Sequence, residues 1–259
     1  MKAMIMAAGL GTRLRPWTLH HPKALVPVGG VPMLERVICR LRDQGFDYIV
    51  VNVYHFADQI KEFLAAHDIG VKIAISDESD LLLDTGGAIA NAAPLLSVDQ
   101  EPFLVHNVDI LSDAPLARLM ELQPESGRDI LLLTSGRESS RKLIFTPENR
   151  LCGWHKVGTE EYRPEGFLPQ PGDSEEAFSG IYVVSGKALA DICRYGREKG
   201  ERKFPIMDYF MDNAAQIDEA AQPAVRIGRH YLPQLNLIDI GRPETLSKAD
   251  SLLDGSRVS

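Results

Sequence analysis

Short apolar runs and amphipathic stretches alternate along the first half of the chain. Residues 3–8 form an unbroken apolar run, which is typical of a strand buried on both faces. Further on, Pro32 can start a helix and Gly45 can end it. Between them, apolar side chains recur at the i, i+3, i+4, i+7 spacing of one helix face, at Leu34, Val37, Ile38 and Leu41. The pattern therefore predicts a buried strand followed by an amphipathic helix.

The same alternation continues to about residue 140. Further strands are predicted at 48–53, 71–75, 103–105 and 130–133, with helices at 57–66 and at 85–96, the second broken near Pro94. Strands that alternate with helices are typical of an α/β domain with a mostly parallel, doubly wound, Rossmann-like sheet. Such sheets bind ligands beyond the carboxyl ends of their strands. The loops that follow the strands are therefore the first place to look for function.

The second half of the chain has a different pattern. A hairpin is predicted from 143–145 and 151–154, then a long loop at 160–176, a strand at 178–184 and helices at 187–197, 205–213 and 243–253. No internal repeat, low-complexity tract or clear linker interrupts the sequence. We therefore predict one domain over residues 1–259, in which residues 141–259 elaborate on the α/β half at 1–140.

Charge and cysteine content narrow the class of protein. The 259 residues include 28 Lys and Arg against 36 Asp and Glu, and the net charge of −8 argues against a nucleic-acid partner. The cysteines, Cys39, Cys152 and Cys193, are too few and too far apart for a disulfide framework, which favours a reducing, cytoplasmic location. No apolar run reaches the roughly 18 residues of a membrane span, and basic residues follow the first apolar run, unlike an export signal. We therefore expect no membrane partner.

The loop after the first predicted strand carries the most informative motif, Gly9-Leu10-Gly11-Thr12-Arg13-Leu14-Arg15-Pro16. A glycine-rich turn after a buried strand lets backbone amides approach a phosphate. A dinucleotide fingerprint would need a small residue in place of Leu14 and an acid near Asn52, and a P-loop would need Gly-Lys-Ser/Thr. Two interpretations remain. Arg13 and Lys23 are cations of a loop that neutralises a triphosphate, or they are solvated basic residues of a surface turn.

Together with Pro22-Lys23-Ala24-Leu25-Val26-Pro27, this loop resembles the signature of sugar-1-phosphate nucleotidylyltransferases, a family with a GT-A-like α/β fold. Further segments follow in the family's order, namely Asp84-Thr85-Gly86-Gly87-Ala88, Asn107-Val108-Asp109, Phe178-Ser179-Gly180-Ile181 and Asp239-Ile240-Gly241-Arg242-Pro243-Glu244. The resemblance spans nearly the whole chain. It is greatest to the compact members, such as N-acetylmuramate-1-phosphate uridylyltransferases and short mannose-1-phosphate guanylyltransferases.

The resemblance implies a reaction in which a nucleoside triphosphate and a sugar 1-phosphate give an NDP-sugar and pyrophosphate. In-line attack on the α-phosphorus needs positioning and charge neutralisation rather than a protein nucleophile. Arg13 and Lys23 are the implied catalytic residues, and Asp109 and Asp239 the implied ligands of Mg²⁺, which prefers one or two carboxylates plus phosphates and waters. For Asp109 alone, a helix cap or a turn is the competing explanation, and for Asp239 it is a turn before the last helix.

The resemblance also implies binding residues in both halves. Those expected to bind the nucleotide are Ala7, Ala8, Gly9, Gly11, Thr12, Asp84, Gly86, Gly87 and Asn107. Those expected to bind the sugar phosphate are Lys156, Glu176, Ser179 and Gly180. A helix-capping role for Asp84, a tight strand-to-helix turn for the glycines at 86 and 87, and a solvated Lys156 are the structural alternatives.

Val108 departs from the family's usual Asn-Gly-Asp, where a valine adds bulk and disfavours positive φ. This leaves several functions open. The leading hypothesis is uridylyl transfer from UTP to N-acetylmuramate 1-phosphate, in the supply of cell-wall or polysaccharide precursors. Guanylyl transfer to mannose 1-phosphate comes next, then a catalytically weak nucleotide-sugar sensor, and last a glycosyltransferase, which would need a further acid where Asn107 stands. A monomer or small homo-oligomer is expected.

Overall fold

The computed structural model describes residues 1–97, 100–215 and 225–255. The chain divides into two compact units, each assembled from separate segments. The first contains Met1–Leu82, Val105–Ala117 and Asn236–Ser259, and the second contains Leu83–Leu104 and Arg118–Leu235. This division does not coincide with the predicted change near residue 140, because the first 140 residues contribute to both units. The prediction of one domain over the whole chain stays a prediction.

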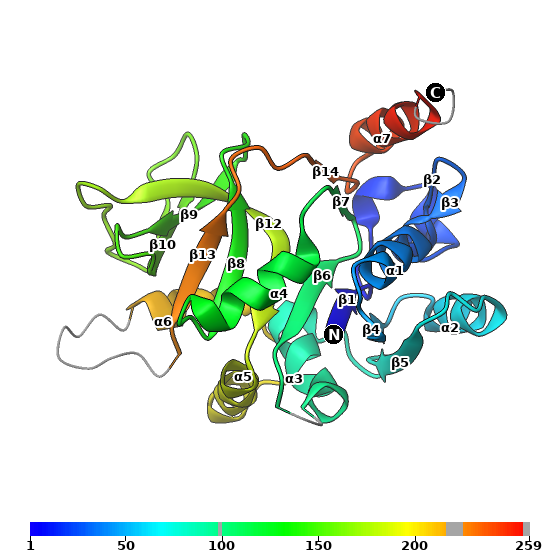
Figure 1. Ribbon diagram of the computed structural model, residues 1–259, viewed down its shortest axis with the longest axis horizontal. Helices are drawn as coiled ribbons and strands as arrows, with labels where there is room; N and C mark the ends of the chain where they lie inside the picture. Colours follow the sequence, from blue (N-terminus) through cyan, green and yellow to red (C-terminus); the bar gives the residue numbers. More distant parts are fainter. Residues whose placement is uncertain (98–99, 216–224, 256–259) are drawn as a thin grey trace. The chain divides into compact units, whose positions relative to one another are not determined.

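The first unit is built on a parallel sheet (Figure 1). Strand β1 (Lys2–Met6) pairs in parallel with β4 (Tyr48–Val53), which pairs in parallel with β5 (Lys72–Asp77). On its other side, β1 neighbours β6 (Phe103–Asn107), whose last three residues belong to this unit. The central residues of β1 and β4 are buried, as their unbroken apolar runs predict. The predicted α/β class with a mostly parallel sheet is confirmed.

Helices and short turns complete the first unit. Its helices are α1 (Met33–Asp43), α2 (Ala57–Ala66) and α7 (Pro243–Gly255), and its two-stranded ribbons are β2 (Pro27–Val28) with β3 (Val31–Pro32) and β7 (Ile110–Ser112) with β14 (Leu237–Asp239). Three 3₁₀ turns, Thr12–Leu14, Trp17–Leu19 and Lys23–Leu25, shape the loop after β1. A small core of Val28, Met33, Ile240 and Ala249 attaches α7 to β2 and α1.

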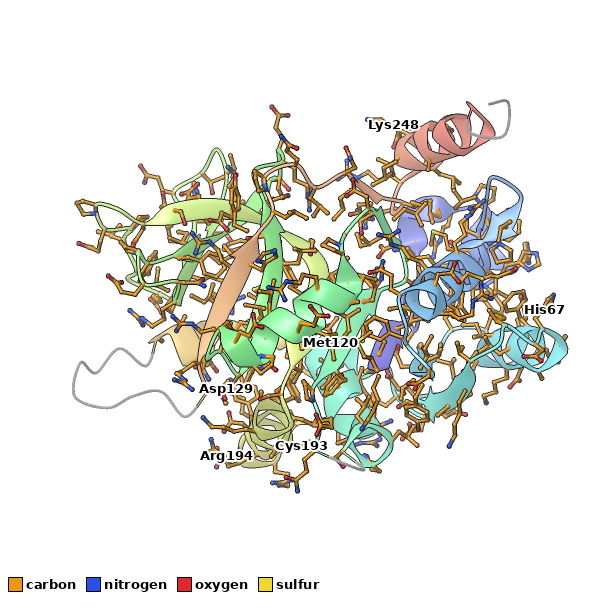
Figure 2. The ribbon with its side chains drawn as sticks, viewed as in Figure 1. His67, Met120, Asp129, Cys193, Arg194 and Lys248 are labelled. Carbon is orange, nitrogen blue, oxygen red and sulfur yellow. The ribbon has the colours of Figure 1, made fainter. Side chains whose placement is uncertain are left out.

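The second unit holds a largely antiparallel sheet. Strand β12 (Ser174–Val184) runs antiparallel to β8 (Ile130–Ser135), and β13 (Ile227–Tyr231) pairs with β8 in parallel. The hairpin β9 (Arg141–Phe145) and β10 (Leu151–Lys156) extends to β11 (Tyr162–Arg163). Asp129, labelled in Figure 2, lies just before β8, where its carboxylate accepts the Arg226 amide at 2.8 Å and so fixes the entry to β13.

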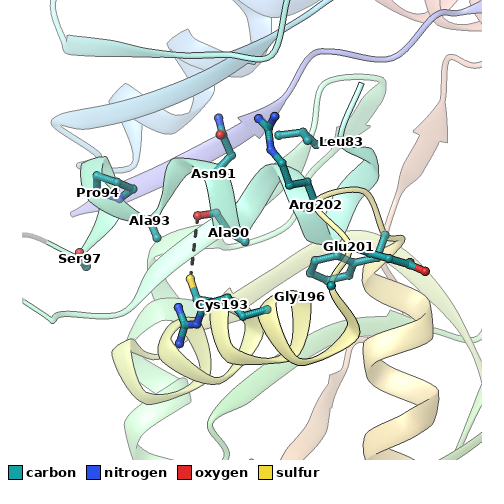
Figure 3. A pocket seen from close by; sticks show the side chains of 14 residues that line it. Leu83, Ala90, Asn91, Ala93, Pro94, Ser97, Cys193, Gly196, Glu201 and Arg202 are labelled. Carbon is teal, nitrogen blue, oxygen red and sulfur yellow. Dashed lines mark hydrogen bonds between the residues drawn. The ribbon is translucent and has the colours of Figure 1, made fainter. Parts of the chain in front are cut away.

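The helices of the second unit include one that corrects a prediction. They are α3 (Asp84–Leu96), α5 (Gly186–Lys199) and α6 (Ile206–Ala215), together with most of α4 (Leu116–Glu125). The predicted break near Pro94 is wrong, since α3 continues to Leu96. A proline this close to the helix end removes one hydrogen bond, the one to the Ala90 carbonyl. The thiol of Cys193 on α5 lies 3.9 Å from that carbonyl oxygen and supplies a weak replacement donor (Figure 3).

The other differences from the predicted elements are local. The predicted loop at 160–176 is wrong at two places, because Tyr162–Arg163 pairs with β10 and because β12 already begins at Ser174. Helix α4 and strand β13 were not predicted. Among the described residues, no helix combines the length and the apolar character that crossing a bilayer requires.

Candidate functional site

The loop after β1 is folded around Gly11. This residue has a positive φ of 60°, and a Cβ added to it would lie 2.7 Å from the Cβ of Lys23. Its carbonyl accepts the Thr18 hydroxyl at 2.9 Å and the Leu14 amide at 2.8 Å. Glycine is therefore required twice, once for the left-handed backbone and once for the close approach of Lys23. The motif thus brings the second basic segment of the loop against the first.

Lys23 reaches Asp109 from this position. Its Nζ donates a hydrogen bond to Asp109 Oδ2, and both side chains are largely shielded, with exposed fractions of 12% for Lys23 and 16% for Asp109. Asp109 lies between β6 and β7, and its carbonyl accepts the Ile240 amide at 2.8 Å. The preceding Val108 donates its amide to the Met6 carbonyl of β1 at 3.3 Å. The aspartate is therefore anchored to β1 on one side and to the segment after β14 on the other.

Asp239 and Arg13 meet at Gly241. Asp239 ends β14, and its Oδ1 accepts the Gly241 amide at 2.8 Å. A Cβ added to Gly241 would lie 2.7 Å from Arg13 Nη2 and 2.7 Å from Asp239 Oδ1. A side chain at this position would therefore push away both the guanidinium and the carboxylate. Gly241 belongs to the family motif, and this close approach explains why a glycine stands there.

The two aspartates fit a hard divalent cation. In the ladder between β7 and β14, Asp239 lies opposite Ile110, the residue that follows Asp109, so both acids stand at the same end of this two-stranded ribbon. Carboxylate oxygens are the ligands that Mg²⁺ prefers, and one or two suffice when phosphates and waters complete its shell. Among the described residues, no group of three or more His, Cys, Asp or Glu side chains is placed to hold a metal. Asp109 and Asp239 would therefore be the protein's share of a Mg²⁺ site, not of a closed structural one.

The start of the loop is held by a buried amide network. Ala7 and Ala8 are buried, and the Ala7 amide donates to Asn52 Oδ1 at 2.7 Å. Asn52, at the end of β4, donates in turn to the buried Glu78 at 2.8 Å. Asn52 was not among the predicted site residues, since it stands where a dinucleotide fingerprint would have an acid. Its polar side chain in an otherwise apolar strand was the signal that it fixes the turn after β1.

Gly9 differs from Gly11 in its surroundings. No described protein atom lies within 4 Å of a Cβ added to Gly9, and its φ is not in the left-handed region. Neither the packing of the described chain nor a left-handed φ therefore requires a glycine at this position. Thr12 beside it is exposed. The nucleotide-binding roles of both residues stay predictions.

Val108 and His106 are buried in this unit. The Val108 side chain is buried, and its φ is not positive, so the valine is accommodated without the strain that a positive φ would bring. His106 donates from Nδ1 to the carbonyl of the half-buried Asn107 at 2.8 Å. Burial lowers the pKa of His106 to about 4, so this ring is neutral at pH 7. The bulk of Val108 is therefore taken up by the core.

The Asp84-Thr85-Gly86-Gly87 motif lies in the second unit, at the start of α3. Asp84, the first residue of α3, has a positive φ of 60°, and its carboxylate accepts the amide of the next residue, Thr85, at 2.6 Å. No side-chain capping bond is made at the start of this helix. The Gly86 and Gly87 amides both donate to the Phe204 carbonyl, at 2.9 and 3.1 Å. A Cβ on Gly86 would overlap the Phe204 ring, and one on Gly87 would overlap the Arg202 carbonyl.

These contacts show why small residues stand at the start of α3. Both glycine amides were predicted to donate to a base or ribose, but in the structure they already donate to the Phe204 carbonyl. Phe204 was not predicted to take part, because its role depends on a backbone carbonyl that no side-chain pattern reveals. The nucleotide-binding roles of Asp84, Gly86 and Gly87 stay predictions.

The predicted sugar-phosphate residues all lie in the second unit, in different environments. Lys156 is about half exposed and pairs with Glu161 at 3.0 Å. Glu176 is buried, and Ser179 is buried with its hydroxyl accepting the Ile181 amide at 3.1 Å. Gly180 follows with a positive φ of 77°. A contact between these residues and a sugar phosphate remains a prediction.

Glu176 belongs to a polar network that was not predicted from the sequence. Its Oε1 accepts Arg229 Nε at 2.5 Å and its Oε2 accepts the Thr134 hydroxyl at 2.5 Å. Arg229 also donates to Asn149 Oδ1 at 3.0 Å and to Ser174 Oγ at 3.2 Å, and it lies over the Phe145 ring. The residues come from β8, β12 and β13 and from the turn before β10, so only the folded sheet brings them together.

Comparisons with known proteins agree with the motif. A family model described as nucleotidyl transferase matches residues 2–251. An N-acetylmuramate alpha-1-phosphate uridylyltransferase from Caulobacter vibrioides is 43% identical over 200 residues, which is 73% of this chain and 77% of the relative. The corresponding Neisseria meningitidis protein is 46% identical over 114 residues, 44% of this chain and 48% of that protein. A Danio rerio mannose-1-phosphate guanylyltransferase catalytic subunit beta is 30% identical over 210 residues, 80% of this chain and 56% of the relative.

The chain thus spans only about half the length of the Neisseria and Danio relatives. Among solved structures, HddC from Yersinia pseudotuberculosis matches with a TM-score of 0.73 and 22% identity, over 97% of this chain and 99% of that one. An apo UDP-glucose pyrophosphorylase matches with a TM-score of 0.75 and 18% identity, over 99% and 98%. At these identities, the structural likeness establishes the fold alone.

Proposed function

This chain belongs to the nucleotidyl transferase family, and we propose that it is a sugar-1-phosphate nucleotidylyltransferase, which makes an NDP-sugar and pyrophosphate from a nucleoside triphosphate and a sugar 1-phosphate. One observation carries the proposal. Within the first unit, the glycine-rich loop brings Lys23 to Asp109, and Arg13 lies beside Gly241 and Asp239. Two cations for phosphates and two acids for a divalent cation thus gather around one glycine-rich turn.

The chemistry follows from these charges. A phosphate oxygen of the sugar 1-phosphate attacks the α-phosphorus, a new P–O bond forms, and the bond to the β-phosphate breaks to release pyrophosphate. Arg13, with its planar fork of donors, and Lys23, with a compact charge, bind the phosphates and offset the negative charge that develops on them. Asp109 and Asp239 would hold Mg²⁺, which would supply further positive charge. The protein's task is to orient the two substrates.

Within this reaction, UTP and N-acetylmuramate 1-phosphate are the proposed substrates. The support is the 43% identity to the Caulobacter vibrioides uridylyltransferase over 77% of its length, against 30% for the Danio rerio guanylyltransferase subunit over 56% of its length. The alternative of a sensor without turnover was based on Val108. Burial of that valine in the first unit weakens the alternative, because the side chain does not protrude from the loop.

The test is pyrophosphate release from a panel of the four nucleoside triphosphates with N-acetylmuramate, mannose and glucose 1-phosphates, each with Mg²⁺ and with EDTA. We expect the highest rate for UTP with N-acetylmuramate 1-phosphate, and none with EDTA. A highest rate for GTP with mannose 1-phosphate would replace the substrate assignment. Absence of release from every pair, with tight binding of an NDP-sugar, would favour the sensor.

A further inference from the structure

The ion pair between Lys23 and Asp109 occupies an oxygen that a metal ligand needs. Lys23 Nζ donates to Asp109 Oδ2, and the two side chains have exposed fractions of only 12% and 16%. Charges that are shielded from water and salt interact more strongly than exposed ones. A divalent cation approaching Asp109 would therefore meet both an occupied carboxylate oxygen and the repulsion of an adjacent ammonium.

The backbone on both sides of this pair is fixed. Gly11 packs against Lys23 Cβ, and the Lys23 carbonyl accepts the Val26 amide at 3.1 Å. The Asp109 carbonyl accepts the Ile240 amide at 2.8 Å. The four-carbon stem of the lysine is the adjustable part, since rotation about it can move the ammonium while the loop and the strands stay in place. Within the described chain, the hydrogen bond to Asp109 is the one that the ammonium makes.

We propose that Lys23 is the resident counter-ion of Asp109, and that it makes binding of the divalent cation depend on the nucleotide. The triphosphate takes over the ammonium, and the carboxylate it leaves is then open to the cation. This inference rests on the proposed function and adds a coupling within the same site. Because coupling between two ligands is reciprocal, the cation tightens nucleotide binding by the same factor as the nucleotide tightens cation binding. The cation alone binds weakly.

The test uses Mn²⁺ as the probe and the nucleotide-free protein, with binding followed by electron paramagnetic resonance. Lys23→Met removes the counter-ion and keeps the length of the stem. We expect it to bind Mn²⁺ about tenfold more tightly than the unaltered protein, a coupling of the usual size. Asp109→Asn in the Lys23→Met background should return the affinity to the weak value. These two results together would place the gain in affinity at Asp109.

A matched control comes from the same unit. Lys61 pairs with Asp77 at 2.6 Å on the surface, with exposed fractions of 36% and 46%. Lys61→Met makes the same change in net charge far from the motif in sequence, so it should change Mn²⁺ affinity by less than about twofold. An equal gain in Lys61→Met and Lys23→Met would overturn the inference, because net charge alone would then explain the result.

Two further outcomes also decide the matter. Unchanged Mn²⁺ affinity in Lys23→Met overturns the proposal, as does a gain that survives Asp109→Asn. If circular dichroism shows that Lys23→Met is unfolded, Lys23→Gln is measured by the same criteria. The readout needs neither a sugar phosphate nor turnover. A protein that releases no pyrophosphate would therefore refute the proposed function, whereas the counter-ion role of Lys23 is decided by Mn²⁺ binding.

Discussion

Lys23–Asp109 in the first unit and Arg229–Glu176 in the second are both shielded ion pairs, but their surroundings differ. Arg229–Glu176 has further partners, since Thr134 and Ser174 donate to Glu176 and Asn149 and Ser174 accept from Arg229. Lys23–Asp109 makes a single hydrogen bond within the described chain. When one side chain leaves a network of several hydrogen bonds, the other members are left with unpaired polar groups, which is costly. In a pair with one hydrogen bond, each charged group can instead bind a ligand of opposite charge. The first arrangement suits a permanent part of the fold, and the second suits a ligand site.

The largest effect is expected at the proposed ligand site of the first unit, to which Arg13 belongs together with Lys23 and Asp109. Arg13→Ala should lower kcat by about 10²–10³, because transition-state charge on the transferred phosphoryl group loses a donor. The melting temperature should hardly change, because Arg13 is exposed. Steady-state kinetics with UTP and N-acetylmuramate 1-phosphate check this. Arg15→Ala is the matched control, an exposed arginine of the same loop outside the proposed site, and should keep kcat within about twofold. Equal losses in both variants would contradict the role of Arg13.

The satisfied network should respond in the opposite way. Arg229→Met leaves the buried Glu176 carboxylate without its cation, and we expect it to lower the free energy of unfolding by about 3–5 kcal/mol. Urea denaturation followed by circular dichroism measures this. Thr134→Val removes one hydrogen bond to the same carboxylate and should cost about 1–3 kcal/mol. If Arg229→Met lowered kcat and left stability unchanged, the network would belong to the ligand site instead.

The buried His106 of the first unit should make the stability of the protein depend on pH. Its pKa is about 4 in the folded protein, against 6.5 for an exposed histidine, because burial disfavours the charged ring. Between these values the unfolded chain binds more protons, so stability falls as the pH is lowered through this window and is fully retained above it. From pH 7 to pH 5, this one group should cost about 2 kcal/mol of unfolding free energy. Denaturation of the unaltered protein and of His106→Gln at both pH values isolates the contribution, and an equal pH dependence in the two would contradict it.

The smallest effect is expected at the exposed pair Lys61–Asp77. The hydrogen bond from Lys61 lowers the pKa of Asp77 to about 2, which reflects a local contact rather than a large contribution to stability, since solvent screens both groups. Lys61→Met should shift the melting temperature by no more than about 2 °C and leave kcat unchanged. Differential scanning calorimetry checks this. A large shift would show that exposure is a poor guide to which ion pairs matter in this protein.

Element type was predictable from the sequence wherever the hydrophobic period was clear. The strand at Tyr48–Val53 and the helix at Ala57–Ala66 have the predicted bounds. The elements that were missed or misjudged depend on partners. Tyr162–Arg163 is a strand because β10 lies beside it. Helix α3 continues past Pro94, and the Cys193 thiol of α5 lies near the Ala90 carbonyl that the proline leaves without its helical donor. Boundaries set by tertiary contacts leave little trace in a local window of sequence.

The sequence by itself determined the family motif and the chemical types that gather at the loop after β1. Glycines, cations and acids at fixed spacings indicate phosphate binding because only those residue types provide the required backbone freedom and charge. Only the tertiary structure decided how the charges are paired. Lys23 and Asp109 are 86 residues apart, and Arg229 and Glu176 are 53 apart, so their partners were fixed by strand order and register. The physical reason is that the interaction between two charges depends on their distance in space, which the folded backbone sets, and not on their separation along the chain.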